Sequence, residues 1–250
     1  MVMLAKGRLQ ARLAETPEDI LTVQRLRYRA FIADTGAQKD KNGLDQDPFD
    51  QVCNHVMIED ISERKLLCCF RMMTLNDASK ISDSYSAQYY ELSALKKFNG
   101  PMVEMGRFCI DPLVKDPNVL RLAWAAMTKY VDDNKVELLF GCSSFKGTDE
   151  QAYADSFAML RDRYLGPKRW LPRVKAPKVF RFAAKLRLAP NPKNAMRSMP
   201  PLLKTYLLMG GWVSDHAVID RHMNTLHVFT GVEIRSIPPA RKRLLRAIAG

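Results

Sequence analysis

One apolar segment with charges inside it constrains this chain most: residues 102–111, MVEMGRFCID. Its apolar residues predict a buried strand, yet Glu104 and Arg107 lie within it. Because an isolated charge is costly in a protein core, such residues are normally paired or functional. Gly106 interrupts the alternation, which predicts a bulge or a close backbone approach. The segment therefore indicates either an acyl-transfer site, with backbone amides left free to bind a carbonyl, or a structural Glu104–Arg107 ion pair.

Composition indicates a folded, cytosolic protein. The chain has 250 residues, of which 47% are hydrophobic, enough to bury a core. It contains no apolar run of 18 residues and no secretory signal at its start, so we expect neither a transmembrane helix nor export. The 5 cysteines are odd in number and lie in apolar runs, which predicts reduced thiols. Neither they nor the 4 histidines are spaced for metal binding, so we predict no metal.

The positive charge is concentrated in the last third of the chain. The net charge is +12, but residues 161–250 hold 19 of the 39 Lys+Arg and 4 of the 27 Asp+Glu. The first 160 residues therefore hold 20 basic and 23 acidic residues. Such asymmetry predicts an acidic partner for the C-terminal third: an acidic protein, an anionic membrane or nucleic acid.

Periodicity and capping signals give an order of elements. Strands are predicted at 9–13, 52–59, 65–74, 102–111, 136–142, 212–217 and 226–230. Helices are predicted at 16–31, 116–134, 148–164 and 201–209. The polar segment 34–50 predicts a long mobile loop. Tyr85, Tyr89 and Tyr90 have helical spacing, which suits core packing or the lining of an acyl tunnel.

This order predicts one α/β domain, 1–250, with a mixed sheet covered on both faces. Its core is expected at about 8–235, with a basic amphipathic insertion at about 165–198 and a basic tail at 236–250.

The order of elements, with Glu104 and Arg107 on the central strand, resembles the GCN5-related N-acyltransferase (GNAT) fold. The resemblance implies a mixed, mostly antiparallel sheet with helices on both faces. That fold usually binds coenzyme A through a glycine-rich loop after the central strand. Residues 113–118, LVKDPN, contain no glycine, so acyl carrier protein is the expected acyl donor. No cofactor is expected, since the acyl carrier protein is a substrate.

Two families that use acyl carrier protein as the acyl donor are similar to this chain. The acyl-homoserine-lactone synthases share an acidic pair like Asp47 and Asp50, an arginine like Arg71 and a segment like 104–108. The L-ornithine Nα-acyltransferases are similar over about residues 8–232. The segments that carry this second resemblance are Phe49-Asp50, Cys53-Asn54-His55, Glu104-Met105-Gly106-Arg107, Leu139–Phe145, Pro200–Lys204 with Tyr206, and Ile219-Asp220.

The second resemblance implies transfer of a 3-hydroxy fatty acyl group from acyl carrier protein to the α-amine of L-ornithine, which gives lyso-ornithine lipid. The attacking amine must lose a proton, for which Glu104 is the expected base and His55 a second base or relay. Arg107 is the third expected catalytic residue. Backbone N–H groups of residues 106–108 are expected to bind the oxyanion.

Further residues are expected to bind the acceptor and the acyl group. Asp47 and Asp50 suit the cationic side chain of ornithine, whereas Arg71 suits its carboxylate or orients the acids. The predicted substrate-binding residues are Asp47, Asp50, Arg71, Phe108 and Ser143.

The basic insertion is expected to dock the partners. The predicted face for the acidic carrier protein and the membrane consists of Lys168, Arg169, Arg173, Lys175 and Lys178. Apolar residues such as Trp170, Phe180 and Phe182 are interleaved with these charges, which predicts peripheral binding to the cytoplasmic face of the inner membrane. The alternative is a solvated face that only recruits carrier protein.

Several alternatives stay open. Cys142 or Cys109 is a less favoured candidate for a covalent nucleophile, because neither has an evident activating base in the sequence. The same chemistry suits glutamine as acceptor, or S-adenosylmethionine to give a homoserine lactone. A nucleic-acid-binding protein is the rival from another class. The basic third lacks interleaved aromatics and any groove-reading motif, so no nucleic acid partner is expected.

Overall fold

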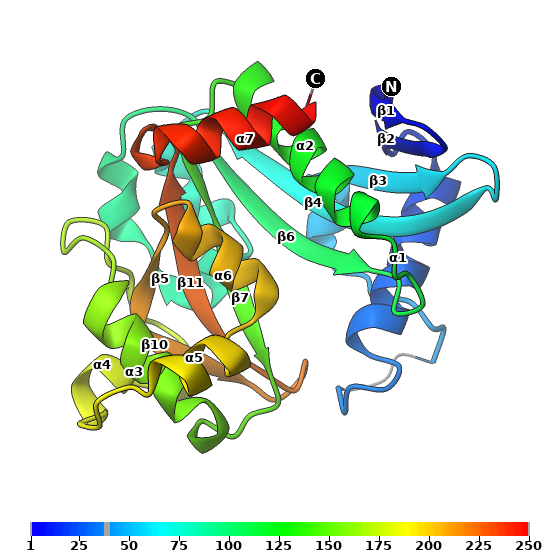
Figure 1. Ribbon diagram of the computed structural model, residues 1–250. Helices are drawn as coiled ribbons and strands as arrows, with labels where there is room; N and C mark the ends of the chain where they lie inside the picture. Colours follow the sequence, from blue (N-terminus) through cyan, green and yellow to red (C-terminus); the bar gives the residue numbers. More distant parts are fainter. Residues whose placement is uncertain (1, 38–40, 250) are drawn as a thin grey trace. The chain divides into compact units, whose positions relative to one another are not determined.

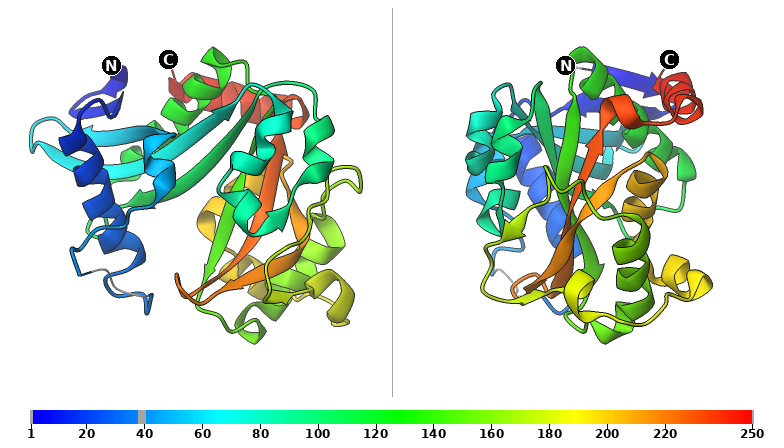
Figure 2. Two further views of the ribbon diagram at one scale, coloured as in Figure 1. Left: turned by 180° about the vertical axis from the view of Figure 1, so that it is seen from behind. Right: turned by 90° about the vertical axis from the view of Figure 1, so that its left-hand side faces the viewer.

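The structure is a computed structural model that describes residues 2–37 and 41–249. The chain forms two compact units (Figures 1 and 2). Unit 1 consists of Met1–Thr74, Met105–Val136 and Pro239–Gly250, and unit 2 consists of Leu75–Glu104 and Glu137–Pro238. Strand β6 (Met102–Ile110) passes from unit 2 into unit 1 after Glu104. The single domain expected from the sequence stays a prediction.

Unit 1 is built on strands in the order β1-β2-β3-β4-β6. The pairs β1/β2, β2/β3 and β3/β4 are antiparallel. The other strand bounds are β1 (Val2–Lys6), β2 (Leu9–Leu13), β3 (Asn54–Asp60) and β4 (Lys65–Leu75). Strands β3 and β4 are buried almost throughout because helix α1 (Pro17–Phe31) covers one face and α2 (Pro117–Asp133) covers the other (Figures 1 and 2). The predicted strands and helices of this unit are confirmed, and β1 was not predicted.

Helix α1 begins where its sequence predicted. The Thr16 side chain accepts a hydrogen bond from the Asp19 N–H, and the Asp19 carboxylate accepts one from the Thr16 N–H. Pro17 occupies the first turn. The Arg12 guanidinium also binds Asp19 at 2.6 and 2.7 Å, and this hydrogen-bonded pairing lowers the pKa of that carboxyl. Local sequence thus explains the entry into α1.

The basic C-terminal tail is a helix, α7 (Pro239–Ala249), which packs along α2 (Figure 1). The Arg246 guanidinium binds the Asp132 carboxylate of α2 at 2.9 Å. Both side chains are exposed, so this pair contributes little stability, and the contact between the two helices holds α7 in place.

Unit 2 contains strands in the order β6-β7-β11-β10-β9. Residues 102–104 of β6 pair in parallel with residues 138–140 of β7, and the remaining pairs are antiparallel. The strand bounds are β7 (Leu138–Lys146), β9 (Val179–Phe180), β10 (Trp212–Asp220) and β11 (Thr225–Glu233). The mixed, mostly antiparallel sheet is therefore confirmed.

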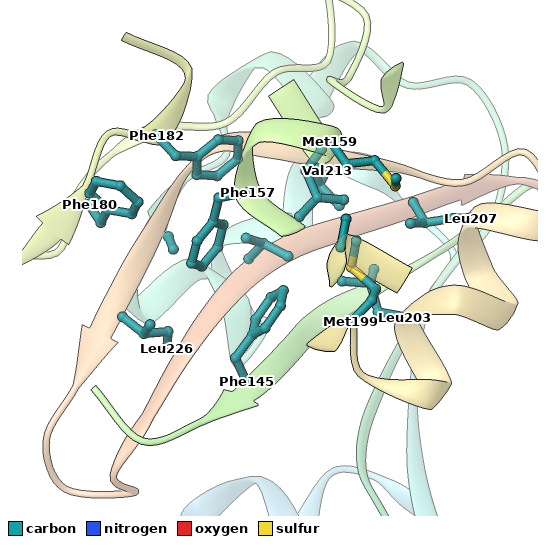
Figure 3. Packing of buried hydrophobic residues seen from close by; sticks show 14 residues of the cluster. Phe145, Phe157, Met159, Phe180, Phe182, Met199, Leu203, Leu207, Val213 and Leu226 are labelled. Atoms are coloured by element: carbon teal, nitrogen blue, oxygen red, sulfur yellow. The ribbon is translucent and has the colours of Figure 1, made fainter. Parts of the chain in front are cut away.

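Four helices cover one face of these strands: α3 (Ala154–Arg163), α4 (Phe182–Lys185), α5 (Pro192–Ser198) and α6 (Pro201–Leu208). Beneath them lies an apolar core in which side chains from α3, α6, β7 and β10 meet (Figure 3). Phe180 and Phe182 are part of this core, where both rings pack on Phe157. They are therefore not the membrane anchors that the sequence predicted, because the fold already buries them.

The opposite face of β7 and β11 is covered by residues 78–98 (Figure 2). The tyrosines with helical spacing do not lie on a helix. They belong to a series of short 3₁₀ turns and to β5 (Tyr90–Glu91), which pairs with β8 (Arg173–Val174). The backbone here closes through hydrogen bonds three residues apart, such as that from the Ala87 N–H to the Ser84 carbonyl and that from the Tyr89 N–H to the Ser86 carbonyl, and not through the i→i−4 bonds of an α-helix.

The start predicted for α3 is also corrected. The Asp149 carboxylate accepts a hydrogen bond from the Gln151 N–H, but this turn leads only to a 3₁₀ segment, Gln151–Tyr153. The α-helix itself begins at Ala154. None of the helices in the described part of the chain has the length and apolarity that crossing a bilayer requires.

Candidate functional site

Unit 1 contains a largely buried network of arginines and aspartates. Arg27, on α1, is 1% exposed. Its Nε donates to the Asp45 carboxylate at 2.8 Å, and its Nη1 donates to the Asp50 carboxylate at 2.6 Å. The Gln24 amide, one turn earlier, adds a bond to Asp50 at 2.9 Å. The helix thus orders both ends of the segment 45–50.

Two further arginines come from the strands. Arg71, on β4, binds Asp47 through both terminal nitrogens, at 2.6 and 2.9 Å, and binds Asp50 at 2.8 Å. Arg107, on β6, contacts Asp45 at 2.9 Å and Asp47 at 3.2 Å. Arg107 is thus paired with the acidic segment, and the Glu104–Arg107 ion pair considered from the sequence stays an alternative.

The network is electrically balanced, since it contains Arg27, Arg71 and Arg107 against Asp45, Asp47 and Asp50. Burial by itself would raise the pKa of the Asp45 carboxyl, but Arg107 and Arg27 lower it below the usual value. Burial likewise opposes ionisation of Asp50, yet the bond to Arg27 and the nearby cations lower its pKa to about 2. Both carboxyls are therefore ionised at neutral pH.

This arrangement bears on the predicted roles of Asp47 and Asp50. The Asp47 carboxylate also accepts the Phe49 N–H at 2.9 Å and begins the 3₁₀ turn Pro48–Gln51. The segment 45–50 is thus held by ion pairs and is not a mobile loop; residues 38–40 of the predicted loop lie outside the described residues. Binding of a substrate cation by Asp47 and Asp50 stays a prediction.

The distortion expected in β6 is present, but at a different residue. Arg107 has a φ of +52°, in the left-handed region that L-residues rarely occupy. Gly106 does not, and a Cβ there would meet Arg71 at an ordinary 3.6 Å. The ion pairs of Arg107 supply the stabilisation that its backbone conformation requires.

His55 and Phe108 also lie in unit 1. The His55 Nε2 donates to the Asp50 carbonyl oxygen at 3.0 Å, and burial lowers the pKa of the imidazole. The Phe108 ring stacks on Phe70 with centroids 5.5 Å apart. A catalytic role for His55 and a substrate-binding role for Phe108 stay predictions.

Glu104 lies in unit 2 and is 5% exposed. Its carboxylate accepts the N–H groups of Tyr85 and Ser86, each at 2.7 Å, and the Ser86 hydroxyl at 2.5 Å. The carboxylate therefore fixes the turn 84–88 above the strands. Its role as a base stays a prediction.

The Ser86 hydroxyl connects Glu104 to Cys142. Its single proton goes to Glu104, so the Cys142 thiol is the donor in the 3.4 Å contact with Ser86. The neighbouring residue Ser143 points to the opposite face, where it is buried and accepts a hydrogen bond from Thr230. Its binding to substrate stays a prediction. Cys109 is the poorer nucleophile, because burial raises the pKa of its thiol well above the usual value.

The predicted docking residues Lys168, Arg169, Arg173, Lys175 and Lys178 are all exposed in unit 2. The Lys175 ammonium donates to the Ala87 carbonyl at 2.6 Å, so one of the five also joins this segment to the turn 84–88. The Arg169 guanidinium lies over the Trp170 ring.

Several of these groups have little or no signal in the local sequence. Arg27 is a charged residue that lies four residues after the core residue Val23, and hence on the same face of α1. That spacing was the available signal. Ser86 carries no local signal, since its contact with Glu104 joins segments that are distant in sequence.

No group of three or more His, Cys, Asp and Glu side chains in the described residues is arranged to hold a metal ion.

The chain is similar to known acyltransferases. The model of the acetyltransferase (GNAT) domain matches residues 26–125. An L-ornithine Nα-acyltransferase of Brucella abortus is 31% identical over 242 residues, which cover 92% of this chain and 86% of the relative. One from Rhodobacter capsulatus is 30% identical and covers 88% and 87%. The structure of FeeM, an N-acyl amino acid synthase from uncultured soil microbes, is 12% identical with a TM-score of 0.49 and covers 97% of each chain. The chain is therefore an N-acyltransferase that belongs to the family of the L-ornithine Nα-acyltransferases.

Proposed function

We propose that this protein transfers a 3-hydroxy fatty acyl group from acyl carrier protein to the α-amine of L-ornithine and so forms lyso-ornithine lipid. The observation that carries the proposal is the similarity over 92% of the chain to a relative named L-ornithine Nα-acyltransferase. The absence of glycine from residues 113–118 favours a carrier protein over coenzyme A as donor, and no cofactor is proposed.

The reaction forms a bond between the ornithine Nα and the acyl carbonyl carbon and breaks the thioester C–S bond. The amine loses a proton, and the carrier thiol leaves with one. Glu104 is the proposed base, because it is a buried carboxylate on β6. This strand corresponds to the central strand of the GNAT fold. The N–H groups of residues 106–108 are the proposed oxyanion donors, supported by the left-handed backbone at Arg107.

The test is a reaction of the purified chain with 3-hydroxyhexadecanoyl carrier protein and L-ornithine, followed by mass spectrometry of the product. We expect a lyso-ornithine lipid with ornithine and none with glutamine or S-adenosylmethionine. The Glu104→Gln variant should lose at least 100-fold in turnover while its circular dichroism is unchanged. A glutamine lipid would correct the acceptor, and a fully active Glu104→Gln variant would correct the base.

Lys168, Arg169, Arg173 and Lys178 are proposed to steer the acidic carrier protein, because all four are exposed and belong to the basic third. Reversal to Glu at these positions should raise the KM for the carrier substrate and leave kcat unchanged. Lys97→Glu, an exposed lysine on another segment of unit 2, is the matched control. An equal effect of the control, or equal use of the acyl-coenzyme A donor, contradicts the assignment.

Peripheral binding to the inner membrane is proposed on charge alone, since two of the predicted apolar anchors are core residues. Liposome flotation tests it. We expect binding to anionic vesicles at low salt and loss of binding in high salt. Binding to DNA with no acyl transfer would instead favour the nucleic-acid alternative.

A further inference from the structure

The imidazole of His227, on β11, has an unpaired buried nitrogen. The residue is 3% exposed, and its Nε2 has no hydrogen-bond partner among the described residues. Buried polar atoms are almost always hydrogen-bonded in native proteins, so an exception needs an explanation. A ligand that supplies the missing partner is one such explanation.

The neighbouring Tyr90 determines which nitrogen carries the proton. The Tyr90 hydroxyl donates its single proton to the His227 carbonyl oxygen at 2.7 Å. The same hydroxyl oxygen lies 3.2 Å from Nδ1, so in this contact Nδ1–H is the donor. Burial lowers the pKa of the imidazole to about 4, so the ring is neutral at pH 7. His227 Nε2 therefore presents a bare lone pair, which is a hydrogen-bond acceptor.

The acceptor lies among aromatic side chains. The Tyr89 ring meets the His227 ring edge-on with centroids 4.9 Å apart, and the Tyr90 ring lies at 5.6 Å. Phe229, two residues along β11, shares the face of His227. The Asp220 carboxylate and the His216 imidazole also lie near enough to shift the pKa of His227, and the His216 Nε2 is likewise buried without a partner among the described residues. The aromatic rings beside His227 Nε2 suit a ligand that is mostly hydrocarbon and carries a hydroxyl donor.

Glu104 and the residues hydrogen-bonded to it lie on the same face of the strands of unit 2. Cys142 lies directly opposite Phe229 in the β7/β11 pairing, so its side chain is on the His227 face. The Cys142 thiol binds Ser86, whose hydroxyl binds Glu104. His227 is thus on the face that holds the proposed base.

We propose that His227 Nε2 accepts a hydrogen bond from the 3-hydroxyl of the acyl chain and so determines the preference for hydroxylated donors. This inference rests on the proposed function and names its specificity residue. A site that pairs with a substrate hydroxyl discriminates against the analogue that lacks it, because the site's own polar atom is then left unpaired. We expect a preference of roughly 10- to 100-fold in kcat/KM.

Two matched variants separate the acceptor from the rest of the ring. His227→Asn keeps an amide N–H where Nδ1 donates to Tyr90 and removes the acceptor at Nε2. His227→Gln places an amide oxygen at that position. We measure kcat/KM with 3-hydroxyhexadecanoyl and hexadecanoyl carrier protein. The preference should fall at least tenfold in His227→Asn and be largely retained in His227→Gln. An unchanged preference in His227→Asn overturns the inference.

A binding experiment on the unsubstituted protein needs neither turnover nor a folded variant. We follow the ¹⁵N resonance of His227 Nε2 with S-(3-hydroxydecanoyl)pantetheine and S-decanoylpantetheine as probes. A change with only the hydroxylated probe supports the inference. The inference is overturned if the two probes change the resonance equally or if neither changes it. The absence of any change is the result expected if a permanent buried water is hydrogen-bonded to Nε2. Absence of ornithine acylation with either donor would instead contradict the proposed function, whatever the resonance shows.

Discussion

Replacing Arg27 by methionine tests the arginine–aspartate network most directly. Methionine keeps much of the bulk of arginine but removes the bonds to Asp45 and Asp50 at 2.8 and 2.6 Å. Breaking a buried ion pair from one side costs roughly 3–5 kcal/mol, because the remaining charge is left uncompensated. Both acids keep another arginine, Arg107 for Asp45 and Arg71 for Asp50. We therefore expect the lower end, about 3 kcal/mol of unfolding free energy.

The measurement is urea unfolding at pH 7, followed by the fluorescence of the 3 tryptophans, of which Trp124 lies in unit 1. Arg25→Met is the matched control, because Arg25 is exposed on the same helix. The control should change the unfolding free energy by no more than about 0.5 kcal/mol.

The deficit of the Arg27→Met variant should also shrink as the pH falls from 7 to 4. In this variant Asp45, Asp47 and Asp50 share only two arginines, so one carboxyl takes up a proton in this range, which removes the uncompensated charge. A deficit below about 1 kcal/mol at pH 7, or one equal to that of the control, would refute the reasoning. A deficit that does not change with pH would show that lost packing, not charge, is responsible.

Three further predictions concern pH and packing. The pKa of Asp50 is lowered to about 2 from 3.8. Its ionised carboxylate therefore contributes about 2 kcal/mol to the unfolding free energy above pH 4, and this contribution is lost as the pH falls to 2. An acid titration of the stability of Asp50→Asn should lack this loss. The pKa of His227 is lowered to about 4 from 6.5. The neutral imidazole therefore accounts for about 3 kcal/mol of unfolding free energy that is present above pH 6.5 and lost as the pH falls towards 4. If the stability of His227→Asn falls with pH as steeply as that of the wild type, this reasoning is contradicted. Gly231→Ala should lower the melting temperature, because the added Cβ would lie 2.5 Å from the Trp212 ring. Gly106→Ala, the control, should leave the melting temperature nearly unchanged. Equal melting temperatures of the two variants contradict the packing argument.

Local patterns predicted the elements whose formation depends on near neighbours. The start of α1 follows from Thr16, Pro17 and Asp19, which interact within one turn. The strands β4, β6, β7 and β11 follow from apolar runs whose period matches a pleated strand. The resemblance to the L-ornithine Nα-acyltransferases, carried by motifs in order along the chain, is confirmed by the relatives.

The partners of the charged residues could not be predicted in this way. Arg27 and Asp45 are 18 residues apart, and Ser86 and Glu104 are also 18 apart. The left-handed residue of β6 proved to be Arg107 and not the adjacent glycine. The sequence by itself determined most of the longer strands and helices and the family to which the chain belongs. Only the tertiary structure decided which charges meet, because desolvation and pairing energies depend on distances that are set when remote segments pack together.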